Sequence, residues 1–189
     1  MFPKLTESII SHRIYQYKPS SKGTLMAEIS PRKEIKFIAD AMLGKLSKWL
    51  RILGFDTLYY RNKENDTLLE LAFKENRQIL TRKTNLKERK NIENHLLFIY
   101  ENDSLKQLLE VLEYYKLTID PHDVFTRCLI CNQKLEALPA ELAKDRVPEY
   151  VANTEKAFFI CPHCKKIFWR GTHYENMWQK IKSTINIQP

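Results

Sequence analysis

The spacing of apolar residues changes several times along the first third of the chain, and each change predicts a new element. Residues 35–39 alternate and end at Asp40, which is typical of a short, largely buried strand. Residues 42–53 carry apolar side chains at helical spacing, and Gly54 ends this predicted helix. Residues 55–60 begin a second strand. A helix between two strands implies a right-handed parallel crossover, so Asp40 lies at the carboxyl edge, where open parallel sheets bind ligands.

Strand and helix patterns keep alternating as far as about residue 120. Asp66 and Ser104 each precede an apolar helical stripe and are suited to cap it. This order predicts an α/β fold with a doubly wound, mainly parallel sheet of about four strands. The further predicted strands are residues 78–81 and 96–100, and the further predicted helices are residues 66–73, 87–91 and 104–112.

All cysteines lie in the last third of the chain and form two Cys-x-x-Cys knuckles. Cys128 and Cys131 make the first, and Cys161 and Cys164 the second. Two such pairs predict a tetrahedral zinc site with thiolate ligands. Two disulfides are the alternative, which a reducing compartment disfavours, and a redox Cys-x-x-Cys normally occurs once, near a βαβ unit. Since four thiolates already complete the shell, we expect His163 on the surface.

A strand-like run follows each knuckle, which is the layout of a zinc ribbon. The long segment between the knuckles has a helical centre at residues 141–144, and a helix around residues 177–181 is predicted to close the chain. A ribbon of this size has too little apolar content to fold alone, so metal binding is expected to supply folding free energy.

The net charge of the chain suggests a polyanionic partner. The net charge is +8 over 189 residues, which is typical of nucleic-acid binding but also of proteins that basic surfaces merely keep soluble. Residues 1–33 carry six Lys and Arg against two Asp and Glu, residues 34–120 carry fifteen against fourteen, and residues 121–189 carry ten against seven. We divide the chain accordingly into a basic arm (1–33), an α/β domain (34–120) and a ribbon with its C-terminal helix (121–189).

The chain shows no sign of a membrane or secretory segment. No apolar run approaches the roughly 20 residues that span a bilayer, and the amino terminus lacks the succession of a secretory signal. We expect a cytosolic protein.

Asp40 and Asp66 both stand where a strand or loop meets a helix start. Carboxylates gathered there can hold Mg²⁺ or Mn²⁺, which would activate water and neutralise a phosphodiester. Helix capping is the alternative role for each. Basic residues nearby favour the phosphodiester, because phosphate contacts position a nucleic acid without reading its sequence. The basic residues so assigned are Lys45, Lys48 and Arg51, with Arg77 and Arg82 adding to them.

Several motifs occur together in one order: FIADAMLGKLSKWLRILGFDTLYY at 37–60, DTLL at 66–69, ILTR at 79–82, the two knuckles, and FWRGTH at 168–173. Together they resemble the Mut-seven C-terminal ribonuclease domain family, which joins a PIN-like nuclease fold to a zinc ribbon. The resemblance covers about residues 35–178. It implies a metal-dependent ribonuclease in which Asp40 and Asp66 are catalytic and hold the metal. We add His173 of the last motif to the RNA-binding candidates.

The chain departs from that family at one position, because the family motif ILTRD reads ILTRK here and ends in Lys83. A charged lysine cannot ligate a cation, and two units of charge change oppose metal binding by several kcal/mol within about 5 Å. Lys83 could instead take the cation's place and favour RNA binding. Three hypotheses follow: a ribonuclease using Asp40 and Asp66, an RNA- or ribosome-binding protein without cleavage, and a protein-interaction module.

Overall fold

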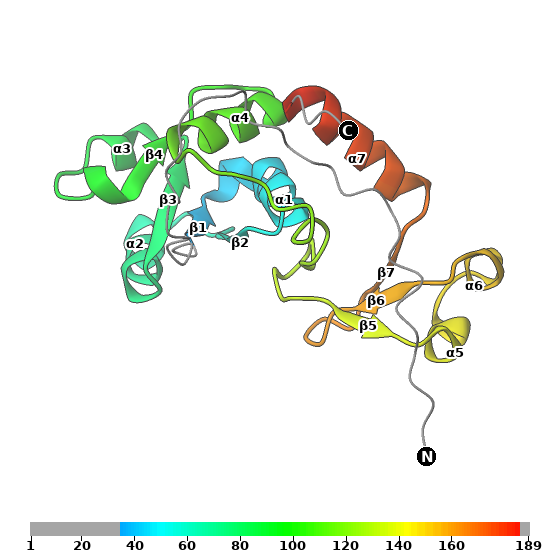
Figure 1. Ribbon diagram of the computed structural model, residues 1–189. Coiled ribbons are helices and arrows are strands. Elements are labelled where there is room, and N and C mark those ends of the chain that lie inside the picture. The colour runs from blue at the N-terminus through cyan, green and yellow to red at the C-terminus, as the bar shows by residue number, and fades with distance from the viewer. Residues whose placement is uncertain (1–34, 186–189) are drawn as a thin grey trace, which may run out of the picture. The chain divides into compact units, whose positions relative to one another are not determined.

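The computed structural model describes residues 35–185, so the predicted basic arm lies outside the described residues (Figure 1). Over this range every helix is too short or too polar to cross a lipid bilayer.

A four-stranded parallel sheet forms the first part of the fold, with strand order β2-β1-β3-β4. Strand β1 pairs with β2 on one side and with β3 on the other. The chain therefore adds β2 on one side of β1 and then crosses to add β3 on the other side. The switch point therefore lies at the carboxyl ends of β1 and β3. This sheet confirms the predicted α/β class. The strands are β1 (Lys36–Ala39), β2 (Asp56–Tyr59), β3 (Arg77–Thr81) and β4 (Leu96–Phe98).

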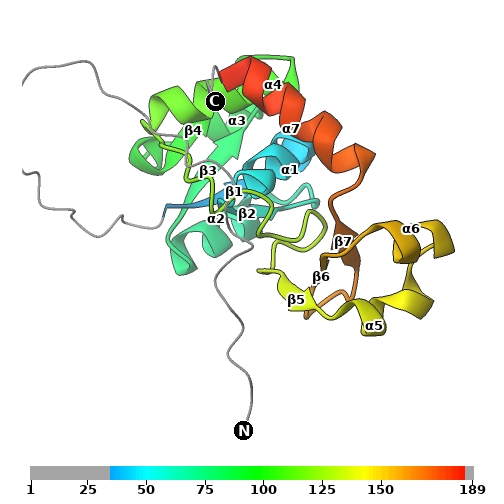
Figure 2. The same cartoon turned by 45° about the vertical axis from the view of Figure 1, so that its right-hand side comes forward.

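Helices cover both faces of the sheet (Figures 1 and 2). Phe37 and Ala39 pack against α1 and α4, whereas Ile38 faces α2 and α3, because successive strand residues point to opposite faces. The elements are η1 (Ala41–Leu43), α1 (Gly44–Ile52), α2 (Asn65–Lys74), α3 (Thr84–Lys87), η2 (Glu93–His95) and α4 (Ser104–Tyr114).

The helix ends in the structure match only some of the ends predicted from the sequence. Gly54 has φ +89° just after α1, which confirms the predicted stop. The N-cap of α2 is Glu64, so the predicted capping role of Asp66 is wrong. Asp103 rather than Ser104 caps α4, since its carboxylate accepts the first free N–H groups. The predicted helix at 87–91 is also wrong, because α3 ends at Lys87.

The second part is a three-stranded antiparallel sheet of order β5-β6-β7 with a small core of Ala143, Phe158 and Ile167. The long closing helix α7 returns to the first part, where Ile181 is buried in the core beside α4 (Figure 2). The elements are β5 (Glu136–Leu138), α5 (Ala140–Ala143), η3 (Lys144–Arg146), α6 (Glu149–Thr154), β6 (Phe158–Ile160), β7 (Ile167–Trp169) and α7 (Thr172–Ile185).

Candidate functional site

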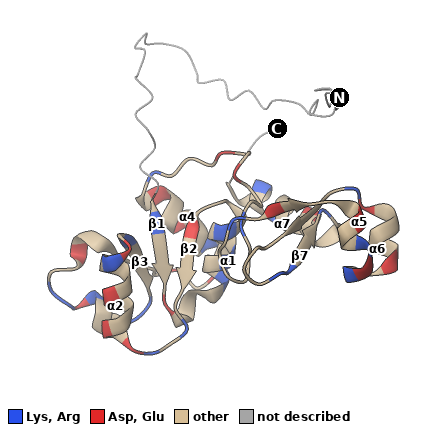
Figure 3. Ribbon diagram, turned by 90° about the horizontal axis from the view of Figure 1, so that it is seen from below, with Lys and Arg blue, Asp and Glu red and all other residues tan. Residues whose placement is uncertain are grey.

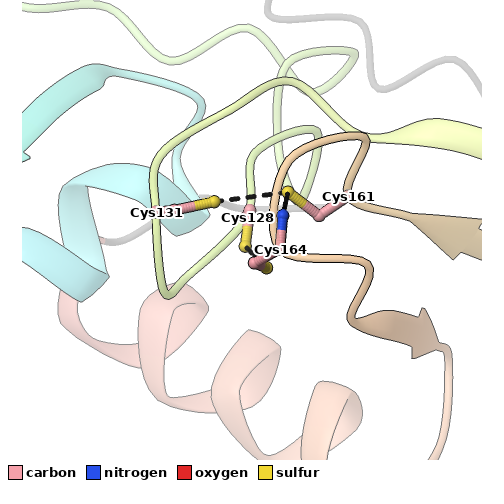
Figure 4. A group of neighbouring side chains, drawn as sticks. All are labelled: Cys128, Cys131, Cys161 and Cys164. Carbon is pink, nitrogen blue, oxygen red and sulfur yellow. Dashed lines mark hydrogen bonds between the residues drawn. The ribbon is translucent and has the colours of Figure 1, made fainter.

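Four cysteines from two loops come together beside this small sheet (Figure 4). The sulfur of Cys128 is 3.6 Å from that of Cys164, and the sulfur of Cys131 is 3.3 Å from that of Cys161. All four sulfurs lie within 4.8 Å of one another, and none is in a disulfide. A tetrahedral ion with bonds of about 2.3 Å places its sulfurs about 3.8 Å apart, so the donors fit a metal ion. His163 is exposed, as predicted.

The local environment ionises these thiols unequally. Burial opposes the Cys161 thiolate, but hydrogen bonds from the Cys164 N–H and the Cys131 thiol outweigh it and lower its pKa to about 7. Burial raises the pKa of Cys131 to about 12. A metal that binds here must displace protons, so its affinity falls as the pH falls.

Arg51 holds the first knuckle against α1. Its Nε donates to the carbonyl of Thr57 at 2.9 Å, and its Nη1 donates to the carbonyls of Leu129 and Ile130 at 2.9 and 3.0 Å. Burial lowers the Arg51 pKa, and three fixed acceptors of the chain itself occupy the guanidinium. Arg51 also lines a cavity together with Lys45 and Lys48, but its side chain is buried rather than exposed.

Arg77 lies at the amino edge of the sheet, opposite the predicted site. Its Nη1 is 2.5 Å from Asp56 and its Nε 2.7 Å from Glu75. Asn132 of the first knuckle also donates to Asp56, at 2.8 Å. Burial disfavours the Asp56 carboxylate, but the bonds from Arg77 and Asn132 outweigh it and lower the Asp56 pKa. Arg77 is buried in this network, at the edge of the sheet opposite the cavity, and leaves little surface for the predicted RNA contact.

Asp40 lies at the switch point, where the sheet predicts a ligand site. Its carboxylate accepts from the N–H groups of Met42 and Arg82 at 2.7 and 2.9 Å, and from the hydroxyl of Thr81. Asp40 has no exposed surface. These bonds cap η1 and tie β1 to β3, which is the capping role left open by the sequence.

Asp66 and Lys83 lie at the other side of this edge, around the start of α2. The Asp66 side chain is 86% exposed and pairs with Arg89 at 2.6 Å. The Lys83 ammonium donates to Asn65 at 2.9 Å and to the carbonyl of Lys63 at 3.1 Å. A positive charge is therefore held at Asn65, the first residue of this helix.

Lys45 and Lys48 line a cavity of about 650 Å³ at the carboxyl edge. Lys and Arg positions recur along α1, which forms one wall (Figure 3). Arg61 lines the same cavity and lies 5.6 Å from the ring of Tyr59, the last residue of β2. Asp103 is the acidic residue of the lining, and it is engaged in capping α4. Positive charge therefore predominates around the cavity, and polar atoms of the 102–104 loop complete it.

The comparison with protein families identifies the chain. The model of the Mut7-C RNAse domain matches residues 35–181, which include both sheets and the cysteine cluster. The chain belongs to the Mut7-C RNAse domain family. Among curated proteins, no match is found.

As a Mut7-C RNAse domain, the chain can be tested for a fit to Mg²⁺ or Mn²⁺. Within residues 35–185, the four cysteines are the single group of three or more His, Cys, Asp or Glu side chains close enough to share an ion. Asp40 is enclosed and accepts three hydrogen bonds, Asp66 pairs with Arg89, and the Lys83 ammonium lies beside α2. These residues do not fit a divalent cation that requires oxygen ligands.

Two predicted RNA contacts are placed but not tested by this geometry. Arg82 donates to the side chain of Asn102 at 2.7 Å and to the carbonyl of Glu101, so it braces the loop beside the cavity. His173 is exposed in the first turn of α7. Sequence reasoning missed Arg61, although a basic residue directly after a parallel strand was a usable signal for the carboxyl edge.

Proposed function

We propose that this Mut7-C RNAse domain binds RNA through the cavity lined by Lys45, Lys48 and Arg61, without metal-dependent cleavage. The cavity carries the proposal, because it collects exposed cations at the sheet edge where parallel folds bind ligands. Each cation that contacts a phosphate releases counterions, which gives sequence-independent affinity. RNA follows from the family's name, and structured RNA, including that of a ribosome, has the required backbone charge.

The absence of cleavage rests on the charges at the switch point. Lys83 brings a positive charge to the start of α2, and Asp40 offers no exposed oxygen. A divalent cation would meet repulsion from Lys83 and would have to displace the donors that Asp40 already holds.

Cleavage of RNA phosphodiesters is the second candidate, and the family match favours it. In that case Asp40 and Asp66 would hold Mg²⁺ or Mn²⁺, which would supply an activated water. This candidate requires the switch point to rearrange when metal and RNA bind.

We further infer that the ion of the cysteine cluster is zinc and that its role is structural. Four thiolates in tetrahedral spacing are the usual donor set of structural zinc sites. The ribbon, proposed to span residues 121–189 with its helix, would then depend on zinc for folding.

Binding can be tested by fluorescence anisotropy with labelled RNA across a salt series. The double variant Lys45→Gln/Lys48→Gln should bind at least about tenfold more weakly, and its salt slope should fall by about 2. The control Lys74→Gln/Lys116→Gln removes the same charge from exposed positions near the amino edge and should bind normally. Equal affinities for the two double variants would overturn the proposal.

Cleavage can be tested with the same RNA in Mn²⁺. The proposal expects intact RNA under conditions in which the protein is bound. Asp66→Asn is the informative variant, because Asp66 is exposed and its replacement should leave the fold intact. If the unaltered chain cleaves the RNA and Asp66→Asn does not, the proposal is overturned and the second candidate, metal-dependent cleavage, takes its place.

A further inference from the structure

Two aromatic rings lie together at the carboxyl end of the edge strand β4. The ring centroids of Phe98 and Tyr100 are 4.8 Å apart with an interplanar angle of 65°. Phe98 is half-buried, whereas Tyr100 is 64% exposed. An exposed ring that is paired with a second ring offers a face on which a base can stack.

Lys87 of α3 fixes this pair. Its ammonium lies 4.8 Å from the centroid of each ring and donates to the Tyr100 hydroxyl at 2.6 Å. The hydrogen bond restrains Tyr100, and cation–π attraction to Phe98 restrains the second ring. We call Phe98, Tyr100 and Lys87 the aromatic platform.

The aromatic platform and the cavity lie at the same carboxyl edge of the sheet, the platform beside α3 and the cavity beside α1 and α4. Tyr100 precedes Asn102, a cavity residue, by two positions, so their Cα atoms are at most about 7 Å apart. The intervening backbone is held on both sides. Glu110 accepts from the N–H groups of Tyr100 and Glu101, and Arg82 donates to Asn102. A strand whose phosphates lie in the cavity can reach the platform by crossing the sheet edge at residues 101 and 102.

We propose that the aromatic platform stacks an unpaired base of single-stranded RNA whose backbone lies in the cavity. This inference rests on the proposed function and adds the substrate class. Stacking on an aromatic ring contributes without regard to base identity, while Lys87 and Arg82 supply charge for the neighbouring phosphates. A base inside a duplex is already stacked and paired, so single strands and loops are preferred.

The test compares a labelled single strand with the same strand in a duplex. Tyr100→Ala should weaken binding of the single strand about tenfold, with no change in salt slope, because a ring and not a charge is removed. Tyr100→Phe keeps the ring and should bind within about twofold of the unaltered chain. Tyr114→Ala removes a similarly exposed ring, 57% accessible, from the end of α4 and should have no effect.

A second measurement changes the RNA instead of the protein. An abasic site moved along the strand should weaken binding at one position in the unaltered chain and at no position in Tyr100→Ala. If the lysine double variant weakens binding but Tyr100→Ala does not, the platform inference is wrong while the proposed function stands. The two rings would then be a candidate surface for protein contact. If the unaltered chain binds no RNA, or the lysine double variant binds normally, the proposed function fails instead.

Discussion

The side chain of Asp40 is enclosed by donors of its own chain, although it stands at the sheet's switch point. Two backbone N–H groups and the Thr81 hydroxyl point at its oxygens, and all three are held by neighbouring elements. A carboxylate in this setting stabilises the fold whether or not it also meets a ligand. Its contribution to stability can therefore be measured in the absence of RNA.

We predict that Asp40→Ala lowers the free energy of unfolding by about 3 kcal/mol, because it leaves buried donors unpaired and removes a helix cap. Urea denaturation followed by circular dichroism measures this. The matched variant Asp66→Ala removes an exposed carboxylate and should cost no more than about 0.5 kcal/mol. Equal losses for the two variants would contradict the structural role of Asp40.

Lys83 allows a gain of function to be tested. In Lys83→Asp a carboxylate replaces the ammonium beside Asn65, so the charge changes by two units at the start of α2. We predict that 5 mM Mn²⁺ then raises the melting temperature by about 3 °C, since a ligand that binds only the folded state stabilises it. Lys90→Asp, at an exposed position, is the control and should not respond. The absence of any Mn²⁺ effect in Lys83→Asp would show that the charge of Lys83 is not the sole obstacle to metal binding.

Single side chains show where sequence reasoning ends. Lys48 and Arg51 are basic residues one helical turn apart, and the sequence assigned both to one exposed face. Both residues line the cavity, but Lys48 is exposed whereas Arg51 is buried, because the carbonyl that Arg51 binds at Leu129 comes from 78 residues further along the chain. No local pattern encodes such a partner, whereas the exposure of Lys48 follows from its position on the helix.

At the scale of elements, local patterns were sufficient for most of the fold. The strand ending at Asp40, the helix ending at Gly54 and the parallel order of the sheet follow from apolar spacing and turn residues. The exceptions are short elements. Helix α3 has one buried apolar residue, Leu86, so its position depends on packing against α2 and the sheet, and its charged sequence did not locate it.

The turn after α1 is the element most constrained by its backbone. Gly54 has φ +89°, and a Cβ at this position would lie 2.5 Å from the backbone oxygen of Asp123. We predict that Gly54→Ala costs about 3 kcal/mol or more, from left-handed strain plus a clash with backbone. Thermal denaturation measures the loss. Gly171→Ala, whose nearest atom is the Trp169 side chain, should cost clearly less. A Gly54→Ala melting temperature equal to that of Gly171→Ala would refute this account.

For the whole molecule, the important contacts join the first knuckle to the parallel sheet. Arg51 reaches the knuckle from α1, Asn132 accepts from the N–H of Thr57, and Arg127 donates to the carbonyl of Gly54. The paired cysteines predicted the knuckle from their spacing alone. The sequence did not show that it is anchored to β2, because each anchor links residues more than 70 positions apart.

Removing the metal should unfold the zinc ribbon before the parallel sheet. Its core has three buried apolar residues, too few to hold it without the ion. We predict that a chelator causes an early melting transition and exposes residues 136–169 to protease, while the parallel sheet keeps its helical and strand signal. Added zinc should reverse both effects. A single unchanged transition after complete metal removal, verified by elemental analysis, would contradict a structural role for the ion.

Acid should weaken the contact between the first knuckle and β2 by protonating Asp56. Its carboxylate meets Arg77 and Asn132, and its pKa is lower in the folded chain than in the unfolded chain. A group with a lowered folded pKa stabilises fully above its unfolded value, about pH 4, and this contribution is lost as the pH falls through the folded pKa. The loss on acidification is thus greatest below about pH 4, where carboxylates of ordinary pKa are already protonated in both states.

We predict that Asp56→Asn lowers the free energy of unfolding by about 2 kcal/mol at pH 7, because Arg77 is then left buried beside a neutral group. Urea denaturation at intervals from pH 7 to pH 3 compares it with the unaltered chain. The two curves should converge as the pH falls, because protonation removes from the unaltered chain the charge that the variant lacks throughout. Glu75→Gln, at the more exposed partner of Arg77, should cost less at pH 7. A constant gap between the Asp56→Asn curve and that of the unaltered chain at every pH would show that the Asp56 carboxylate is not ionised in this junction.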